Sequence, residues 1–272
     1  MRIDLLKRIL AVPTCSRQEG RMVEFLTAYV KEGGERLRGR CWSDAHNNVY
    51  IIKGRADHYP CVAAHIDTVH LMTPVQIAQL DRVLIGFDQR GQRTGIGADD
   101  KAGVYICLEL LERFDDIAVA LFAAEEIGCQ GAYAADAAFF EKVGYVVEFD
   151  CPARGLLSYT SGGVRMFQND GDFIQRALPV LQAHGLTRWQ HHPFSDVMAL
   201  RQRFEFSCLN LSCGYHSWHR PDEYLALDEV EAAFASGQDL LRVLGCRHYA
   251  FDADGGEAAL PLLEVTGLQL AI

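Results

Sequence analysis

The chain has 272 residues, of which 49% are hydrophobic and 23% charged, and its formal net charge is −10. This length and composition are typical of a globular protein with one large α/β domain or two small ones. The acidic balance carries no block of like charges, which argues against nucleic acid or an anionic membrane as the main partner.

The hydrophobic pattern predicts strands that alternate with helices. Two helices open the chain, over 4–11 and from the Ser16 region to about Lys31, and strands follow over 48–53 and 61–64. The other expected elements are a hairpin over 75–88, helices from Ala102 and over 131–140, 171–184, 195–197 and 228–244, and strands over 117–124, 145–149, 156–169 and 204–211. Residues 189–193 are expected to be irregular.

This alternation predicts an α/β fold with a mostly parallel central sheet and helices on both faces. We expect a single catalytic domain over 1–246, and a tail over 247–272 that the pattern does not assign. No apolar run is long enough to span a membrane, and the first residues are too charged for a signal peptide. Nine scattered cysteines without a Cys-x-x-Cys pair indicate reduced thiols and a cytoplasmic protein.

Acidic residues and a histidine follow directly on predicted strands. His65 ends one strand, Glu125-Glu126 follow the apolar run 117–124, and Asp150 follows 145–149. Asp99 lies where a loop becomes a helix, a place where an aspartate is also a common helix cap. In open α/β sheets, functional sites form outside the carboxyl ends of the strands, so these side chains are expected to meet at one edge.

Imidazole together with carboxylate is the ligand set of catalytic zinc. Acids at the end of a buried strand cost desolvation energy unless a cation compensates them. If Asp99 is shared between two ions roughly 3.5–4 Å apart, those ions can activate one water and polarise one carbonyl. Asp67 lies two residues after His65 and therefore on the same strand face, where it can orient the ring.

Five stretches in register resemble the co-catalytic di-zinc exopeptidases, a superfamily that includes peptidase T, carboxypeptidase G, the aminoacylases and the zinc aminopeptidases. They are His65-x-Asp67, the GADDK stretch 97–101, the EEIG stretch 125–128, Asp150 and the HRPDE stretch 219–223. The resemblance covers about residues 1–245. Members with a lid insert a whole domain between the last aspartate and the last histidine, but here only 69 positions separate them (219 − 150), so we expect no lid.

The resemblance also implies residue roles. One zinc ion would be bound by His65, Asp99 and Asp150, and the other by Asp99, Glu126 and His219, with a cis peptide between Asp99 and Asp100. Glu125 would be the general base and Asp67 would orient His65. The residues alone do not separate Glu125 from Glu126. His216 lies in the same loop as His219 and is kept as a substrate contact, whereas the spacing to Glu223 favours His219 as the ligand.

The implied function is that of a zinc exopeptidase, an aminopeptidase that hydrolyses short peptides, with cobalt or manganese as alternative metals. The alternative enzyme is an amidohydrolase that deacylates N-acyl amino acids or related small amides. A single-zinc cyclotransferase would not need the complete His65-x-Asp67 set, and a non-catalytic binding module should have lost a ligand or the base. The expected partner is a small peptide or amide, with no nucleic acid and no membrane, and the oligomeric state is left open.

Overall fold

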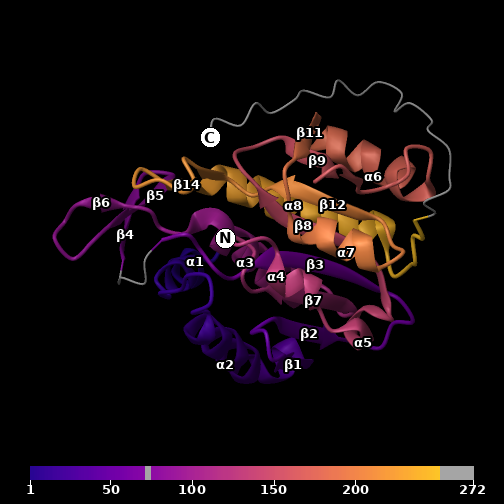
Figure 1. Cartoon of the computed structure of the whole chain (residues 1–272), viewed down its shortest axis with the longest axis horizontal. Helices are drawn as coiled ribbons and strands as arrows, with labels where there is room; N and C mark the ends of the chain where they lie inside the picture. Colours follow the sequence, from indigo (N-terminus) through magenta and orange to yellow (C-terminus); the bar gives the residue numbers. More distant parts are fainter. Residues whose placement is uncertain (71–74, 252–272) are drawn as a thin grey trace.

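A nine-stranded mixed sheet forms the centre of the protein (Figure 1). The structure, a computed structural model, describes residues 1–70 and 75–251. The strands of this sheet are β1 (Gly39–Ser43), β2 (Val49–Lys53), β7 (Ile117–Phe122), β3 (Tyr59–His65), β8 (Val143–Cys151), β12 (Cys208–Ser212), β9 (Leu156–Ser161), β10 (Val164–Arg165) and β11 (Arg188–His192). They are hydrogen-bonded in the order β1-β2-β7-β3-β8-β12-β9-β10, with β11 paired to β9.

The four central strands β7, β3, β8 and β12 run parallel to one another. Residue Ala63 of β3 lies opposite Ala120 of β7 and Glu148 of β8, so the three strands end at the same level. Nearly every residue of these strands is buried, because parallel strands are covered on both faces. Their carboxyl ends therefore form one common edge in the middle of the sheet.

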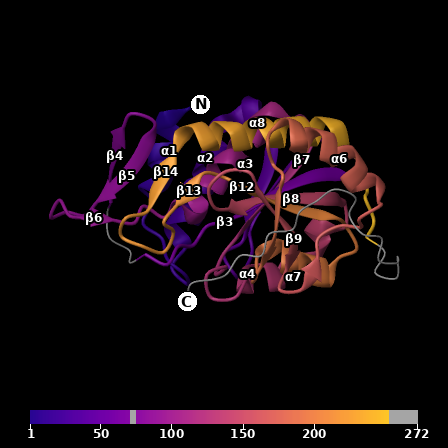
Figure 2. The same cartoon turned by 90° about the horizontal axis from the view of Figure 1, so that it is seen from above.

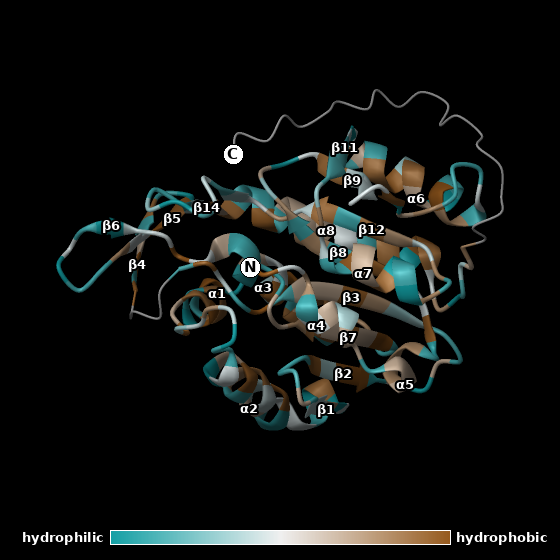
Figure 3. Ribbon diagram, viewed as in Figure 1, coloured by the Kyte–Doolittle hydropathy of each residue, from teal (hydrophilic) through white to brown (hydrophobic). Residues whose placement is uncertain are grey.

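Helices cover both faces of the sheet (Figure 2). The helices are α1 (Ile3–Leu10), α2 (Gly20–Leu37), α3 (Ala98–Arg113), α4 (Gln130–Tyr133), α5 (Ala137–Phe140), α6 (Asp172–Ala183), α7 (Asp196–Arg203) and α8 (Leu227–Leu244). In Figure 2 α3, α6 and α8 lie above the sheet, and α4 and α7 lie below it. The brown colour of the central strands in Figure 3 shows that the core is apolar. The predicted α/β fold is thus confirmed.

A small second sheet extends from one end of the molecule, at the left of Figure 1. Its strands are β4 (Gln76–Leu80), β5 (Val83–Phe87), β6 (Arg93–Thr94), β13 (Tyr215–His216) and β14 (Tyr224–Ala226). The predicted hairpin over 75–88 is confirmed by β4 and β5. Pairing of β14 with β5 brings the segment after Cys213 beside the loop before α3. The segment between Asp150 and His219 holds strands and helices of the core.

Two local predictions were wrong, and one strand was not predicted. Residues 188–192 form β11, because β9 supplies backbone partners for a polar segment that carries no strand pattern of its own. Residues 39–43 form β1 on the edge of the sheet, where the strand pairs with β2. The helix expected over 131–140 is divided into α4 and α5, since Asp136 caps α5 by accepting a hydrogen bond from Ala138 N.

The division at residue 246 remains a prediction. Tyr249 is buried, and its N–H donates to Gly144 O, while Ala250 forms a β-bridge with Phe206. The rest of the predicted tail, 252–272, lies outside the described residues. Among the helices of 1–70 and 75–251, none is long and apolar enough to cross a membrane.

Candidate metal centre

The edge formed by β3, β7 and β8 brings the predicted site residues together. His65 is the last residue of β3, Glu125 and Glu126 follow β7, and Asp150 is the next-to-last residue of β8. Asp99 enters from the first turn of α3, which packs across β3, β7 and β8. His219 comes from the loop between β13 and β14. Residues far apart in the chain therefore share one site, as expected for this edge of an α/β sheet.

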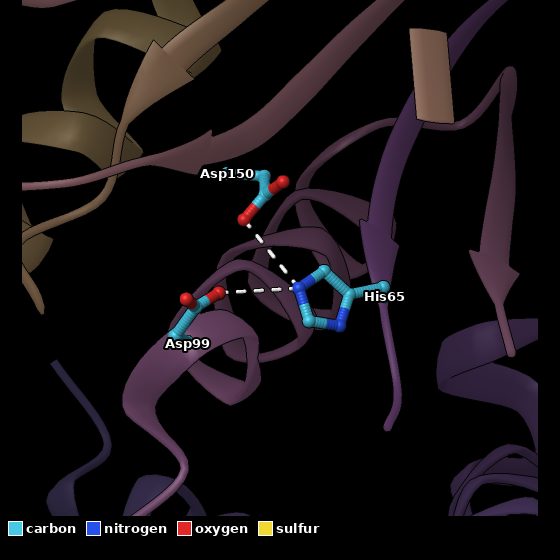
Figure 4. Close-up of side chains that lie close together, drawn as sticks. All are labelled: His65, Asp99 and Asp150. Atoms are coloured by element: carbon cyan, nitrogen blue, oxygen red, sulfur yellow. Dashed lines mark hydrogen bonds and ion pairs between the residues drawn. The ribbon is translucent and has the colours of Figure 1, made fainter. Parts of the chain in front are cut away.

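His65, Asp99 and Asp150 form the first group that can hold a metal ion. Figure 4 shows both carboxylates facing the same nitrogen of the His65 ring: Nε2 lies 3.1 Å from Asp99 Oδ1 and 3.5 Å from Asp150 Oδ1. One ligand atom from each residue lies within 4.8 Å of the other two. The group is nearly closed to solvent, since His65 is 1% exposed.

Asp99, Glu126 and His219 form the second group. His219 Nε2 lies 2.9 Å from Glu126 Oε2 and 3.3 Å from Asp99 Oδ2. Asp99 thus turns one oxygen toward His65 and the other toward His219, which is the arrangement of a bridging carboxylate. The side chain of His219 is 44% exposed, so this group opens toward solvent, on the side from which a substrate can approach.

His216, the other histidine of the loop, is held away from both groups. Its Nε2 lies 2.7 Å from Glu229 Oε2, and its ring stacks on Tyr224 with centroids 4.7 Å apart. The role of His216 as a substrate contact remains a prediction. Neither candidate group among the described residues includes His216.

Glu125 lies beside both groups but belongs to neither. Its Oε2 is 3.9 Å from His65 Nε2, and Cys129 Sγ donates to its Oε1 at 3.5 Å. Burial raises the pKa of Glu125 well above its ordinary value, and the neighbouring carboxylates add to the effect. Glu125 is thus a buried carboxyl group that lies close to the two ligand groups without belonging to them. A carboxyl group in this position can act as a general acid or base.

Asp67 organises the site through several contacts. The sequence predicts that its carboxylate orients the ring of His65. In the structure the backbone oxygen of Asp67 is closer to His65 Nδ1, at 3.0 Å, than the carboxylate Oδ1, at 3.4 Å. The carboxylate mainly accepts hydrogen bonds from the backbone N–H groups of Glu125 and Glu126, at 3.0 and 3.3 Å, and from the hydroxyl of Ser16 at 2.7 Å. Asp67 therefore fixes both the ring and the loop that carries the two glutamates.

Asp100 anchors the first turn of α3. The peptide bond between Asp99 and Asp100 is cis, as the resemblance implies. The Asp100 carboxylate accepts from His65 N at 3.2 Å and from Gly103 N at 3.0 Å. A Cβ atom at Gly103 would lie 2.3 Å from Phe149 O, so only glycine lets the helix approach β8 this closely. These contacts explain the compact GADDKAG stretch.

The crowded carboxylates of the site suit cations. Burial raises the pKa of Asp150 to about 7 and that of Glu126 above its ordinary value. Among the described residues, Glu126 Oε1 is buried without a hydrogen-bond partner. Only the two histidines oppose the carboxylates within the two groups. A donor set of imidazole and carboxylate with an unpartnered buried oxygen fits divalent cations.

Metal uptake should release protons. Hydrogen bonds that His219 donates to the carboxylates of Asp99 and Glu126 raise its pKa to about 10, so the ring is protonated near pH 7 in the metal-free protein. A metal ion must displace this proton, and apparent affinity should fall as the pH is lowered below 10. Calorimetric metal titrations at pH 7 in two buffers of different ionisation enthalpy should show that saturation with metal releases at least about one proton from each chain. Binding heats that are independent of the buffer would contradict this assignment.

Two features of the site were missed from the sequence. Ser16 was assigned to a helix start, but its hydroxyl bonds to Asp67, 51 positions away, and no local pattern signals this contact. Asp196, at the start of α7, is fully buried beside Glu125 and Glu148, and burial raises its pKa well above the ordinary value. The Ser195-Asp196 stretch was the only signal for it, and Ser195 bonds to Ser161 rather than to its own helix.

Fold and site together define a metal-dependent hydrolase with two adjoining ligand groups on an α/β sheet. The chain belongs to peptidase family M28, because the model of that family matches residues 47–204, more than half of its length. It is therefore a metallopeptidase, and the resemblance to the co-catalytic metallopeptidases is confirmed. No curated protein has a significant match to the chain.

Solved structures share the fold at low sequence identity. Aminopeptidase PepT from Bacillus cereus ATCC 10987 has a TM-score of 0.72 and 12% identity over 89% of this chain and 97% of its own. A tripeptidase from Staphylococcus aureus subsp. aureus Mu50 has a TM-score of 0.73 and 11% identity over 89% of this chain and 97% of its own. The TET1 peptidase of Pyrococcus horikoshii has a TM-score of 0.65 and 14% identity, covering 88% and 98%. These likenesses concern the fold.

Proposed function

We propose that the protein is an aminopeptidase that removes residues from the free amino termini of short peptides with the help of two zinc ions. The observation that carries the proposal is the Asp99 carboxylate, which turns one oxygen to each ligand group while Glu125 stands unligated beside them. The names of similarly folded proteins, an aminopeptidase and a tripeptidase, agree with this substrate class.

In this proposal one zinc ion is held by His65, Asp99 and Asp150, and the other by Asp99, Glu126 and His219. Bound zinc supplies Lewis acidity, which lowers the pKa of a water and polarises a peptide carbonyl. Manganese or cobalt would suit the same imidazole and carboxylate donors. The choice of zinc as the native metal is therefore part of the proposal.

The protein's own side chains transfer the proton and hold the site in place. Glu125 takes a proton from the attacking water at its carboxylate and passes it to the nitrogen of the leaving amine. Its buried position and the nearby acids make the protonated form stable enough to carry that proton between the two steps. Asp67 keeps Glu125 in place through the backbone N–H, and keeps the His65 ring turned to the metal side.

A turnover screen tests the substrate class. Zinc-loaded protein is offered free dipeptides and tripeptides, the same peptides N-acetylated, and N-acyl amino acids. We expect cleavage only where the amino terminus is free. Cleavage of the acylated compounds alone would replace the aminopeptidase by the amidohydrolase alternative, and no turnover of any compound would contradict both.

We also propose a cytoplasmic location. All nine cysteines are unpaired, and six of them are buried, as expected of a reducing compartment. Fractionation of the native host with detection by antibody tests this proposal, and recovery outside the cytoplasm would contradict it.

A further inference from the structure

We propose that Glu223 is a positioning residue of the metal centre, whose carboxylate ties the loop that carries Asp99 to the loop that carries His219. The inference rests on the proposed function, because it concerns the ligands assigned there. Glu223 lies four positions after His219 and does not belong to either ligand group. Its side chain is fully buried, so its oxygens need partners within the protein.

The carboxylate of Glu223 finds these partners in the backbone just before α3. Oε2 accepts hydrogen bonds from Ile96 N and Gly97 N, both at 2.8 Å, and Oε1 accepts from Asp99 N at 3.1 Å. These contacts span more than 120 positions in the sequence. Glu223 thus holds the segment that directs the two oxygens of Asp99 toward the two ligand groups.

Glu223 also reaches a third loop. His70 Nε2 lies 2.8 Å from Glu223 Oε2, and His70 follows Asp67 in the loop after β3. The imidazole of His70 packs directly on Gly95, where a Cβ atom would lie 2.0 Å from the ring. The loops that carry Asp67, Asp99 and His219 are therefore joined at one carboxylate.

A buried lysine of the first turn of α3 joins this segment to the start of the chain. Lys101 is 4% exposed, and its ammonium donates to the backbone oxygens of Leu10 and Val12, at 3.2 and 2.8 Å. Burial lowers the pKa of Lys101, and the negative charge of Glu223 offsets part of this effect.

The consequence for metal binding follows from the geometry. Without a carboxylate at position 223, the buried N–H groups of Ile96, Gly97 and Asp99 lose their acceptor, and the segment must shift to find others. Groups that orient metal ligands typically change metal affinity or activity by about 10–100-fold when they are removed. The group with Asp99, Glu126 and His219 should suffer more, since Glu223 adjoins two of its members, whereas His65 and Asp150 lie on strands.

Two variants and a matched control test the role. Glu223→Gln keeps the size of the side chain but replaces one acceptor oxygen by an N–H donor. Glu223→Asp keeps the charge near Lys101 but shortens the reach by one methylene. Glu229→Gln is the control for zinc binding, because Glu229 also pairs with a histidine of the same region, His216, and neither belongs to a ligand group among the described residues.

Zinc titrations against a competing chelator measure the two binding events separately. The wild type and Glu229→Gln should bind two zinc ions for each chain. In both Glu223 variants we expect the second zinc to bind at least about tenfold more weakly, with the first changed less. At saturating zinc, the kcat of both Glu223 variants should fall while their KM stays within about threefold of the wild-type value, because only the orientation of the catalytic groups changes.

Variants that bind both zinc ions with wild-type affinity would overturn the inference alone. A wild type that binds no zinc would overturn the proposed function and this inference together. If neither variant folds, hydrogen exchange on the zinc-free wild type decides: the amides of Ile96, Gly97 and Asp99 should exchange at least about 100-fold more slowly than an unstructured chain. Unprotected exchange at these three amides would contradict the role of Glu223 as their acceptor.

Discussion

Asp99→Ala should remove both zinc ions and essentially all peptidase activity. Each oxygen of this carboxylate faces a different ligand group, so one substitution deprives both groups of a ligand. We expect the zinc content to fall from two to none after dialysis, and kcat/KM to fall by at least about 10³-fold, equivalent to about 4 kcal/mol of transition-state stabilisation.

The stability of the variant offers an independent measurement. A ligand present at about 1,000 times its Kd stabilises the folded state by about 4 kcal/mol, so zinc should raise the Tm of the wild type but not that of Asp99→Ala. Asp88→Asn is a matched control, because the Asp88 carboxylate accepts turn hydrogen bonds from Arg90 N and Gln92 N and belongs to neither ligand group of the described residues. Two zinc ions retained by Asp99→Ala would remove this residue from the centre of the site.

Glu125→Gln should abolish turnover while both zinc ions stay bound. The amide has nearly the size of the carboxylate but cannot take a proton from water, and general base catalysis typically contributes about 10²–10⁴-fold. We therefore expect kcat to fall within that range with little change in zinc content. Because Glu125 belongs to neither ligand group, metal analysis and kinetics on the same sample separate its role from that of Glu126.

Glu109→Gln is the control for this experiment. Glu109 is also a buried glutamate, but it lies in the C-terminal half of α3 and pairs with Arg2. Its variant should keep wild-type kcat per folded molecule. Glu125→Gln with wild-type activity would refute the assignment of the base, and loss of zinc from it would make Glu125 a ligand.

The ligand types and their approximate places could be predicted from the sequence because each lies at a boundary with a strong local signal. The run IAVALFAA before Glu125 marks a strand that is buried on both faces, and parallel strands must present their carboxyl ends together. The order of strands, with β3 between β7 and β8, explains why His65 meets both neighbouring loops. Assigning Glu125 and Glu126 to different roles needed the family resemblance, since the two are identical in type and adjacent.

The chain by itself determined the α/β alternation and the acids and histidine at the strand ends, whereas the cis peptide between Asp99 and Asp100 was implied only by the family resemblance. These are local properties, set by periodicity and residue type within about ten positions. Only the tertiary structure decided that Ser16 bonds to Asp67 and that Glu223 holds the Asp99 loop, and it places His219, the histidine that the family spacing favours, against Asp99. Each of these depends on hydrogen bonds between segments far apart in sequence, which fold topology and burial select and local pattern does not encode.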